Sequence, residues 1–247
     1  MKIRYHHLIT LGLLAVSTSA IAMPPINFIF GLGAGAGNLQ VERNTNTTIV
    51  SAITNEPVST FGGNYNDSGN GGALGGLFGL STAFNNVFSV ALEGTVNYLS
   101  SNADVSITNP GGFVGQNVNF DQELKMSYGI SLVPTVTINQ NNNLAIFGRV
   151  GYTLGEFEFD NTGTTTFDQG YNGNFNKSLD GLTLGLGLSV PLKQDISLQL
   201  EADHTQFDSI SKTSYDLFTT NTTTTTYKPD INIAMLSLVF SLPTSIG

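Results

Sequence analysis

The stretch Phe88-Ser89-Val90-Ala91-Leu92-Glu93-Gly94-Thr95-Val96-Asn97-Tyr98 alternates apolar and polar side chains. Successive side chains of a strand point to opposite faces, so this segment is a strand that is apolar mainly on one face. Its length, about ten residues, is that of a strand that crosses a bilayer at a slant. The stretch is therefore compatible with a half-buried strand of a soluble sandwich and with a strand of a transmembrane barrel. The apolar face comprises Phe88, Val90, Leu92, Val96 and Tyr98, and the polar face comprises Ser89, Glu93, Thr95 and Asn97.

The connections between strands decide between these two folds. Three connections are short, and four are long, polar and rich in Gly, Asn, Thr or Ser, and the two kinds alternate along the chain. Bacterial outer-membrane barrels have short periplasmic turns, long extracellular loops and an even strand number. The sequence therefore predicts an all-β, eight-stranded antiparallel up-and-down transmembrane β-barrel with four long extracellular loops. The predicted strands are Ile26 to Glu42, Gly72 to Phe84, Val87 to Ser100, Gln122 to Ile138, Leu144 to Phe159, Lys177 to Leu192, Ile196 to Phe207 and Asp230 to Leu242. The short turns are Asn85-Asn86, Asn139 to Asn143 and Lys193 to Asp195, and the long loops are Arg43 to Gly71, Ser101 to Asp121, Asp160 to Asn176 and Asp208 to Pro229.

The same alternation predicts which residues face lipid. Seven strands give one clear apolar face, and Tyr98, Tyr128 and Tyr152 fit an aromatic girdle. In the last strand, Ile231, Ile233 and Met235 compete with a second set, and we expect the second set outside with a change of phase upstream. That second set is Leu236, Leu238 and Phe240. Other lipid-facing residues include Phe28, Phe30, Leu32, Leu74, Phe78, Leu80, Met126, Ile130, Leu132, Val136, Ile146, Val150, Leu154, Leu182, Leu184, Leu186, Leu188, Val190, Ile196, Leu198 and Leu200.

The first 22 residues have the features of a cleaved secretory signal. Lys2 and Arg4 form a basic start, Leu8 to Val16 is apolar, and Ala20-Ile21-Ala22 is an A-x-A cleavage site. The apolar run is far shorter than the roughly 20 residues that a membrane-spanning helix needs. We therefore predict a signal peptide over residues 1–22 and one barrel domain over residues 23–247, exported to the bacterial outer membrane.

The charge balance and the absence of cysteine restrict the partners and the stabilising forces. Once Lys2 and Arg4 are removed, 7 basic residues remain against 18 acidic ones, a formal charge of −11, which disfavours nucleic acid as a partner. With no cysteine, burial and hydrogen bonding must hold the exported domain without disulfides.

The chain resembles the eight-stranded outer-membrane barrels that include opacity-type proteins, bacterial surface antigens and the OmpA transmembrane domain. The resemblance is carried by Phe147 to Tyr152, by Leu184 to Val190 with Leu198 to Asp203 after a tight turn, and by Leu236 to Phe240. It implies an outer-membrane surface protein inserted by the assembly machinery. Members usually end on an aromatic residue that this machinery reads, whereas Phe240 is followed by seven further residues.

Charged residues are the candidates for a functional site. By parity, several face the lumen, where opposite charges must pair because an isolated buried ion is costly. They are expected to form an ion network that plugs the narrow barrel, and the alternative is the charged constriction of a pore, for which inward Gly31, Gly33, Gly35, Gly185 and Gly187 leave space. The lumen set is Glu93, Lys125, Arg149, Glu201 and Asp203, and the candidate lipopolysaccharide contacts at the outer rim are Arg43, Lys177, Lys212 and Lys228.

No catalytic, metal or cofactor site is predicted. The Gly-x-Gly patterns lie within strands with no helix after them, and Asn64 to Asn70 lacks the spacing and terminal Glu of a calcium loop. His204 with Ser209 or Ser211 is the nearest approach to the Ser-His dyad of lipid A-modifying barrels, but neighbouring Asp203 would face the other way.

The sequence thus favours a non-enzymatic outer-membrane surface protein with a structural, adhesive or antigenic role, whose loops contact a host or surface ligand. Two alternatives stay open: a narrow porin-like channel for small solutes, and a lipid A-modifying enzyme. Outer-membrane lipid and lipopolysaccharide are the expected surroundings.

Overall fold

The computed structural model describes residues 25–50, 54, 56–108, 117–139, 144–164, 173–215 and 222–244. The predicted signal segment lies outside these residues. Each of the eight predicted strands falls largely or wholly within an observed strand. None of the described residues forms a helix long and apolar enough to cross a membrane. The strands are β1 (Ile26–Val50), β2 (Pro57–Ala83), β3 (Phe88–Leu99), β4 (Asn102–Thr108), β5 (Asn117–Asn139), β6 (Leu144–Thr164), β7 (Gly173–Lys193), β8 (Ile196–Phe207), β9 (Ile210–Tyr215) and β10 (Thr222–Pro243).

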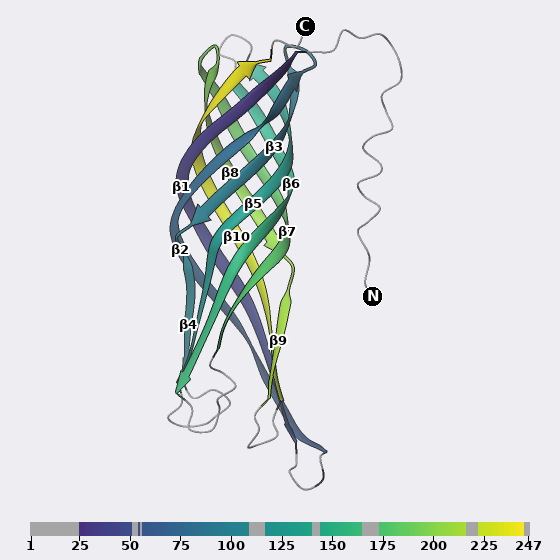
Figure 1. The fold of residues 1–247 in the computed structure, drawn as a ribbon, viewed down its shortest axis with the longest axis vertical. Helices are drawn as coiled ribbons and strands as arrows, with labels where there is room; N and C mark the ends of the chain where they lie inside the picture. The colour runs from purple at the N-terminus through teal and green to yellow at the C-terminus, as the bar shows by residue number, and fades with distance from the viewer. Residues whose placement is uncertain are drawn as a thin grey trace, which may run out of the picture.

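The strands close into one antiparallel barrel, because β1 pairs with both β2 and β10 (Figure 1). β4 continues the position of β3 beside β5, and β9 continues that of β8 beside β10, so the ring has eight positions as predicted. One row of paired residues, followed around the ring, starts at Gly69 and returns to β2 at Gly79, ten residues further on. This stagger means that each row of neighbours runs obliquely to the barrel axis. The row is Gly69, Leu39, Ile231, Thr205, Thr183, Gly151, Ser131, Glu93 and Gly79.

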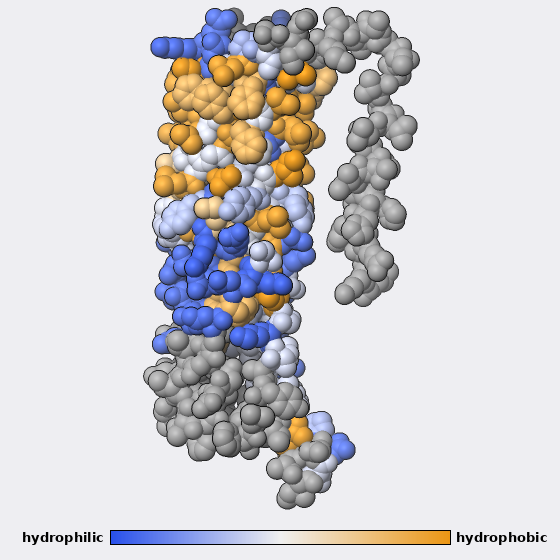
Figure 2. All heavy atoms as spheres, viewed as in Figure 1, coloured by the Kyte–Doolittle hydropathy of each residue, from blue (hydrophilic) through white to orange (hydrophobic). Residues whose placement is uncertain are grey.

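An apolar belt surrounds the end of the barrel that carries the short turns. Figure 2 shows this band above a predominantly hydrophilic region. We call the part of the barrel beyond the belt, which contains β4, β9 and the adjoining parts of the longer strands, the outer half. Most of the predicted lipid-facing residues are exposed there: Leu32 is 74% exposed and Leu186 is 69% exposed. Asn85 orders one of the short turns, where its side-chain oxygen accepts hydrogen bonds from the backbone N–H groups of Val87 and Phe88 at 2.8 and 2.7 Å. The belt is the membrane-spanning part of the barrel.

The strands continue well beyond the belt. β1 has 25 residues and β2 has 27, whereas a membrane strand needs about 9 to 11. Most of the residues predicted as long loops are therefore strand, which is a correction: β1 and β2 together leave only residues 51–56 between them. The excess of about a dozen residues per strand carries the barrel roughly 30 Å past the belt.

The outer half divides into two four-stranded sheets. Beyond the end of β3 at Leu99, β2 pairs only with β1, and beyond the end of β8 at Phe207, β7 pairs only with β6. Among the described residues, no backbone ladder joins β2 to β4 or β7 to β9. We call the unit of β9, β10, β1 and β2 sheet A and that of β4, β5, β6 and β7 sheet B. The barrel is thus a closed ring in the membrane and two facing sheets outside it.

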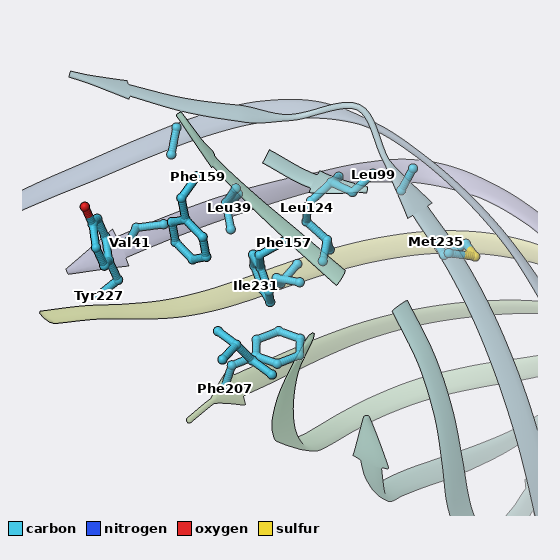
Figure 3. Close-up of a cluster of buried hydrophobic side chains, with 13 residues drawn as sticks. Leu39, Val41, Leu99, Leu124, Phe157, Phe159, Phe207, Tyr227, Ile231 and Met235 are labelled. Atoms are coloured by element: carbon cyan, nitrogen blue, oxygen red, sulfur yellow. The ribbon is translucent and has the colours of Figure 1, made fainter. Parts of the chain in front are cut away.

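The outer half has an apolar core of its own. Phe157 and Phe159 from sheet B meet Tyr227 and Ile231 from sheet A, all at most 2% exposed (Figure 3). Ring centroids of Phe159 and Tyr227 are 4.9 Å apart. The polarity of the strands is therefore reversed outside the membrane, where polar side chains face water and apolar ones face the core.

In the last strand, the predicted outward set is confirmed and the predicted change of phase is wrong. Ile231, Ile233 and Met235 all face inward, and Leu236, Leu238 and Phe240 all face outward, with uniform parity along β10. No change of phase occurs. Both sets are apolar because the two faces of β10 have different apolar surroundings. Its inward face packs in the core of the outer half as far as Met235, and its outward face meets lipid from Leu236 onward.

Candidate functional site

Arg149, on β6, is the centre of a buried ion cluster in the lumen of the belt. Its Nη2 lies 2.9 Å from Oε2 of Glu93 on β3 and 2.9 Å from Oε2 of Glu201 on β8. Its Nε lies 3.6 Å from Oδ2 of Asp203. The Arg149 side chain is 2% exposed. One guanidinium thus faces three carboxylates from two other strands, and four of the five residues predicted for the lumen come together here.

Gly185 makes room for this cluster. It pairs with Arg149 on one side and with Asp203 on the other. A Cβ atom at position 185 would lie 1.8 Å from Oδ1 of Asp203. The Asp203 carboxylate therefore fills the space that a side chain at position 185 would take, and Gly185 does not open a channel.

Lys125 does not belong to the lumen cluster, contrary to the prediction. A register shift between Leu124 and Met126 marks a bulge in β5 at this residue. The extra residue turns Lys125 outward, where its ammonium group forms an ion pair with Glu158. Strict parity counted through a bulge places every residue on one side of it on the wrong face.

Side chains fill the lumen on both sides of the ion cluster. A smaller apolar cluster closes the side that carries the short turns. On the other side, the hydroxyl groups of Thr153, Thr183 and Thr205 follow, joined by hydrogen bonds of 2.6 and 2.8 Å. The apolar core of the outer half comes next, and near the far end Thr47 and Thr223 join their hydroxyl groups at 3.0 Å. The cluster on the side of the short turns is Ile29, Leu77, Ala91, Val133, Phe147 and Val239.

Arg43 is a structural residue of the outer half and not a rim contact, which corrects the second predicted set. Its side chain is fully buried, with Nε 3.5 Å from Oδ2 of buried Asp67. The guanidinium lies 3.5 Å from the Phe120 ring centroid and 4.8 Å from that of Tyr65. Burial raises the pKa of Asp67 above its ordinary value, and the positive charge of Arg43 acts against that rise. The prediction failed because Arg43 and Asp67 were assigned to one loop.

The three lysines of the second set have different surroundings. Lys177 is exposed on β7. Lys212 reaches from β9 to β7, where its Nζ lies 4.5 Å from the Phe175 ring centroid. Lys228 is half-exposed and pairs with Glu42, Nζ to Oε2, at 3.2 Å. Lys212 therefore connects the two sheets across one seam.

A row of aspartates crosses the outer face of sheet B. Asp104 on β4 pairs with Asp121 on β5, which pairs in turn with Asp160 on β6. Burial, a hydrogen bond with Asp104 and the surrounding negative charges raise the pKa of Asp121 to about 6. Like charges directly opposite one another destabilise a sheet, so β4 is weakly held on β5 when all three are ionised.

His204 faces outward on β8. Its Nδ1 lies 2.9 Å from Oδ1 of Asn232. Ser211, on the outer face of β9, has its hydroxyl 2.7 Å from that of Thr226. His204 and Ser211 are thus engaged with other partners. Among the described residues, no group of three or more His, Cys, Asp or Glu side chains is arranged to hold a metal ion.

Comparisons with solved structures return outer-membrane barrels. OprG from Pseudomonas aeruginosa is 16% identical, with 88% of this chain and 97% of that chain covered and a TM-score of 0.49. The outer membrane protease OmpT from Escherichia coli is 11% identical, with coverages of 92% and 100% and a TM-score of 0.45. Ail, the attachment invasion locus protein of Yersinia pestis, is 13% identical, with coverages of 83% and 99% and a TM-score of 0.34.

No curated protein matches the sequence. The family description does: residues 8–240 match the outer membrane protein beta-barrel domain, and the closed ring, the apolar belt and the short turns at one end are the fold of that family. The chain belongs to the outer membrane protein beta-barrel domain family.

Proposed function

We propose that the protein is a non-enzymatic surface barrel whose rigid outer half carries its connecting segments away from the bacterial outer membrane, where they serve a structural, adhesive or antigenic role. The observation that carries this proposal is the outer half itself. It is built as two sheets around an apolar core, with Phe159 and Tyr227 packed between them. A barrel that only crossed the membrane would not need this second core.

The packed lumen supports this role over that of a channel. The Arg149 cluster lies between two layers of buried apolar side chains. Phe147 on one side of the cluster and Phe157 on the other are 2% and 1% exposed. A porin-like channel for small solutes stays the second candidate, because an eight-stranded ring is just wide enough to hold a small ligand. Reconstitution in planar bilayers separates the two: we expect no steady single-channel steps from purified protein.

The absence of cysteine permits a direct test of surface display. Val58→Cys, on β2 near its far end, should react with a membrane-impermeant maleimide on intact cells, because Val58 is 66% exposed. Asp195→Cys, in the short turn before β8, is the matched control and should react only after the outer membrane is opened. Equal labelling of both, or labelling of Asp195→Cys alone, would contradict the proposed orientation.

Shortening the connecting segments tests whether they carry adhesion or antibody recognition. A variant in which residues 109–116 and residues 216–221 are each replaced by the two-residue turn Asn-Gly keeps all ten strands, because Thr108 pairs with Asn117 and Tyr215 pairs with Thr222. We expect this variant to keep its heat-modifiable migration on a gel while losing adhesion or antibody recognition. Unchanged adhesion and recognition by the folded variant would disprove the role.

Mass spectrometry of lipid A from cells with wild-type protein and with His204→Ala checks the enzyme alternative, and we expect identical acyl patterns.

A further inference from the structure

A groove of about 900 Å³ follows the outer wall of the barrel between two neighbouring rows of outward-facing residues. The row nearer the outer half includes Asn70, Asn38, Asn232 and His204, and the row nearer the short turns includes Ala36, Ala234 and Ala202. The residues between these two rows, Gly37, Ile233, Asp203, Gly185 and Arg149, also line it, whereas the next lumen-facing residues on either side, Leu39, Glu201, Thr205 and Met235, do not. The groove is therefore on the outside of the barrel.

The polar end of the groove consists of two hydrogen-bonded pairs of side chains, Asn38 with Asn70 and Asn232 with His204. Asn38 Nδ2 donates to Oδ1 of Asn70 at 2.8 Å and to the Gly69 carbonyl at 3.0 Å. Asn232 Oδ1 joins His204 Nδ1 at 2.9 Å. The two pairs lie next to each other across β2, β1, β10 and β8, because Asn38 is opposite Asn232 in the sheet. Oδ1 of Asn38 is buried and has no hydrogen-bond partner among the described residues.

The other end of the groove is apolar and lies deeper in the belt. Leu184 and Leu186 on β7 and Val150 on β6 form its walls, and Pro134 on β5 is at its end. Because rows of paired residues run obliquely to the barrel axis, the groove descends from the polar border of the belt into the lipid-facing surface. One continuous groove thus offers amide and imidazole groups at the water side of the belt and a hydrocarbon wall deeper in the belt.

We propose that this groove binds one glycolipid of the outer leaflet, with sugar hydroxyl groups on the Asn38–Asn232–His204 side and an acyl chain along Leu184, Leu186 and Val150. The occupant must be amphipathic, because the groove joins the two environments. Neutral amides suit sugar hydroxyls, which both donate and accept hydrogen bonds. A phosphate alone is less suited, since the nearby ammonium group of Lys228 is paired with Glu42.

The groove lies on the wall of the barrel, so its occupancy does not depend on surface display, and it takes the place of the predicted lipopolysaccharide contact at Arg43, which is buried. A bound lipid also gives a reason for the alanines of the row nearer the short turns. Ala36, Ala234 and Ala202 sit side by side where most of the belt has large side chains. They leave the hollow that an acyl chain or sugar ring needs.

Retention of lipid by the purified barrel tests the proposal. Protein is reconstituted in phospholipid nanodiscs that contain a small fraction of rough-type lipopolysaccharide, released, and analysed by native mass spectrometry. We expect one retained lipopolysaccharide molecule on the wild type. Asn38→Leu with Asn232→Leu removes the amides, and Ala234→Leu fills the hollow. Each should weaken retention about tenfold, the effect of one or two lost hydrogen bonds.

Two control variants keep the result specific. Val96→Leu adds bulk to the belt on β3, and Asn176→Leu removes an exposed amide from the outer face of β7, both away from the groove. Both should retain lipopolysaccharide as the wild type does, and heat-modifiable migration shows that every variant is folded. Equal retention by groove variants and wild type, equal losses in the controls, or retention of phospholipid in place of lipopolysaccharide would each overturn the proposal.

Discussion

The guanidinium of Arg43 on β1 lies 3.5 Å from the centre of the Phe120 ring on β5 and joins the two sheets of the outer half. The same guanidinium faces Asp67 on β2. A cation held between an aromatic ring and a carboxylate, all buried, couples the strands that no backbone ladder joins. The two sheets are thus held together by side chains where the ring of backbone hydrogen bonds has ended.

Removing Arg43 should loosen the outer half without disturbing the belt. Arg43→Met leaves Asp67 buried without its cation, so we expect a loss of about 3 to 5 kcal/mol from the outer half. The double variant Arg43→Met with Asp67→Asn should recover most of this loss. Hydrogen exchange of β2 and β5 amides measures the effect. Faster exchange in belt and outer half alike would show that the two parts do not respond separately.

Arg149 should matter more for the belt. Arg149→Leu leaves Glu93, Glu201 and Asp203 facing one another without a cation, so we expect a loss of about 3 to 5 kcal/mol in resistance to urea. Adding Glu93→Gln and Glu201→Gln to this variant should restore part of the stability, because fewer carboxylates then need a partner. Urea resistance equal to wild type in Arg149→Leu would refute the role of this cluster.

The attachment of β4 should depend on pH. The pKa of Asp121 is raised from 3.8 to about 6, so the folded state holds its proton more tightly than the unfolded state. Stability from this group is therefore greatest at low pH, falls as pH rises from about 4 to 6, and stays low above that. Hydrogen exchange of β4 amides, corrected for its intrinsic pH dependence, should show this fall in the wild type.

Asp121→Asn is the control for this pH dependence. The amide cannot ionise, so protection of β4 should change much less across the same range. Asp104, Asp160 and Glu123 remain as charged neighbours, and Lys125 stays paired with Glu158. A wild type and variant with the same pH profile would locate the dependence elsewhere.

The core of the outer half should be as sensitive as that of a soluble protein. Phe157→Ala removes a ring that packs edge-on against Phe207 with 4.9 Å between centroids, so we expect a loss of about 3 to 5 kcal/mol. Asn176→Ala, exposed on the outer face of β7, should change stability by no more than about 0.5 kcal/mol. Protease resistance of the outer half under partial denaturation compares the two.

The sequence was sufficient for the belt and insufficient for the outer half. In the belt, alternation is strict, and lipid-facing residues such as Leu186 and Tyr152 could be assigned from parity alone. Outside it, β2 contains Gly62, Gly63 and Gly69 among polar residues, a composition that indicates a loop. Pairing with β1 makes it a strand, and such pairing is a tertiary effect that local composition does not contain.

The candidate sites show the same limit. Arg149, Glu93 and Glu201 could be brought together from parity, because no bulge in their own strands interrupts the count. Lys125 could not be placed, since the bulge beside it leaves no signal in the sequence. Arg43 needed the partner Asp67 on the next strand, and the register that pairs β1 with β2 becomes visible only when the outer half is recognised as sheet.

The threonine-rich ends of β1 and β10 bear on how the barrel reaches its final position. A charged side chain at the middle of a bilayer costs about 2 to 4 kcal/mol on a barrel strand. Thr45 and Thr47 on β1, and the run Thr222 to Thr226 on β10, present hydroxyl groups instead, which bond to one another across the strands. Wherever these strand ends meet hydrocarbon during insertion they therefore avoid that cost, which Glu42, Arg43 and Lys228 further along the same strands do not.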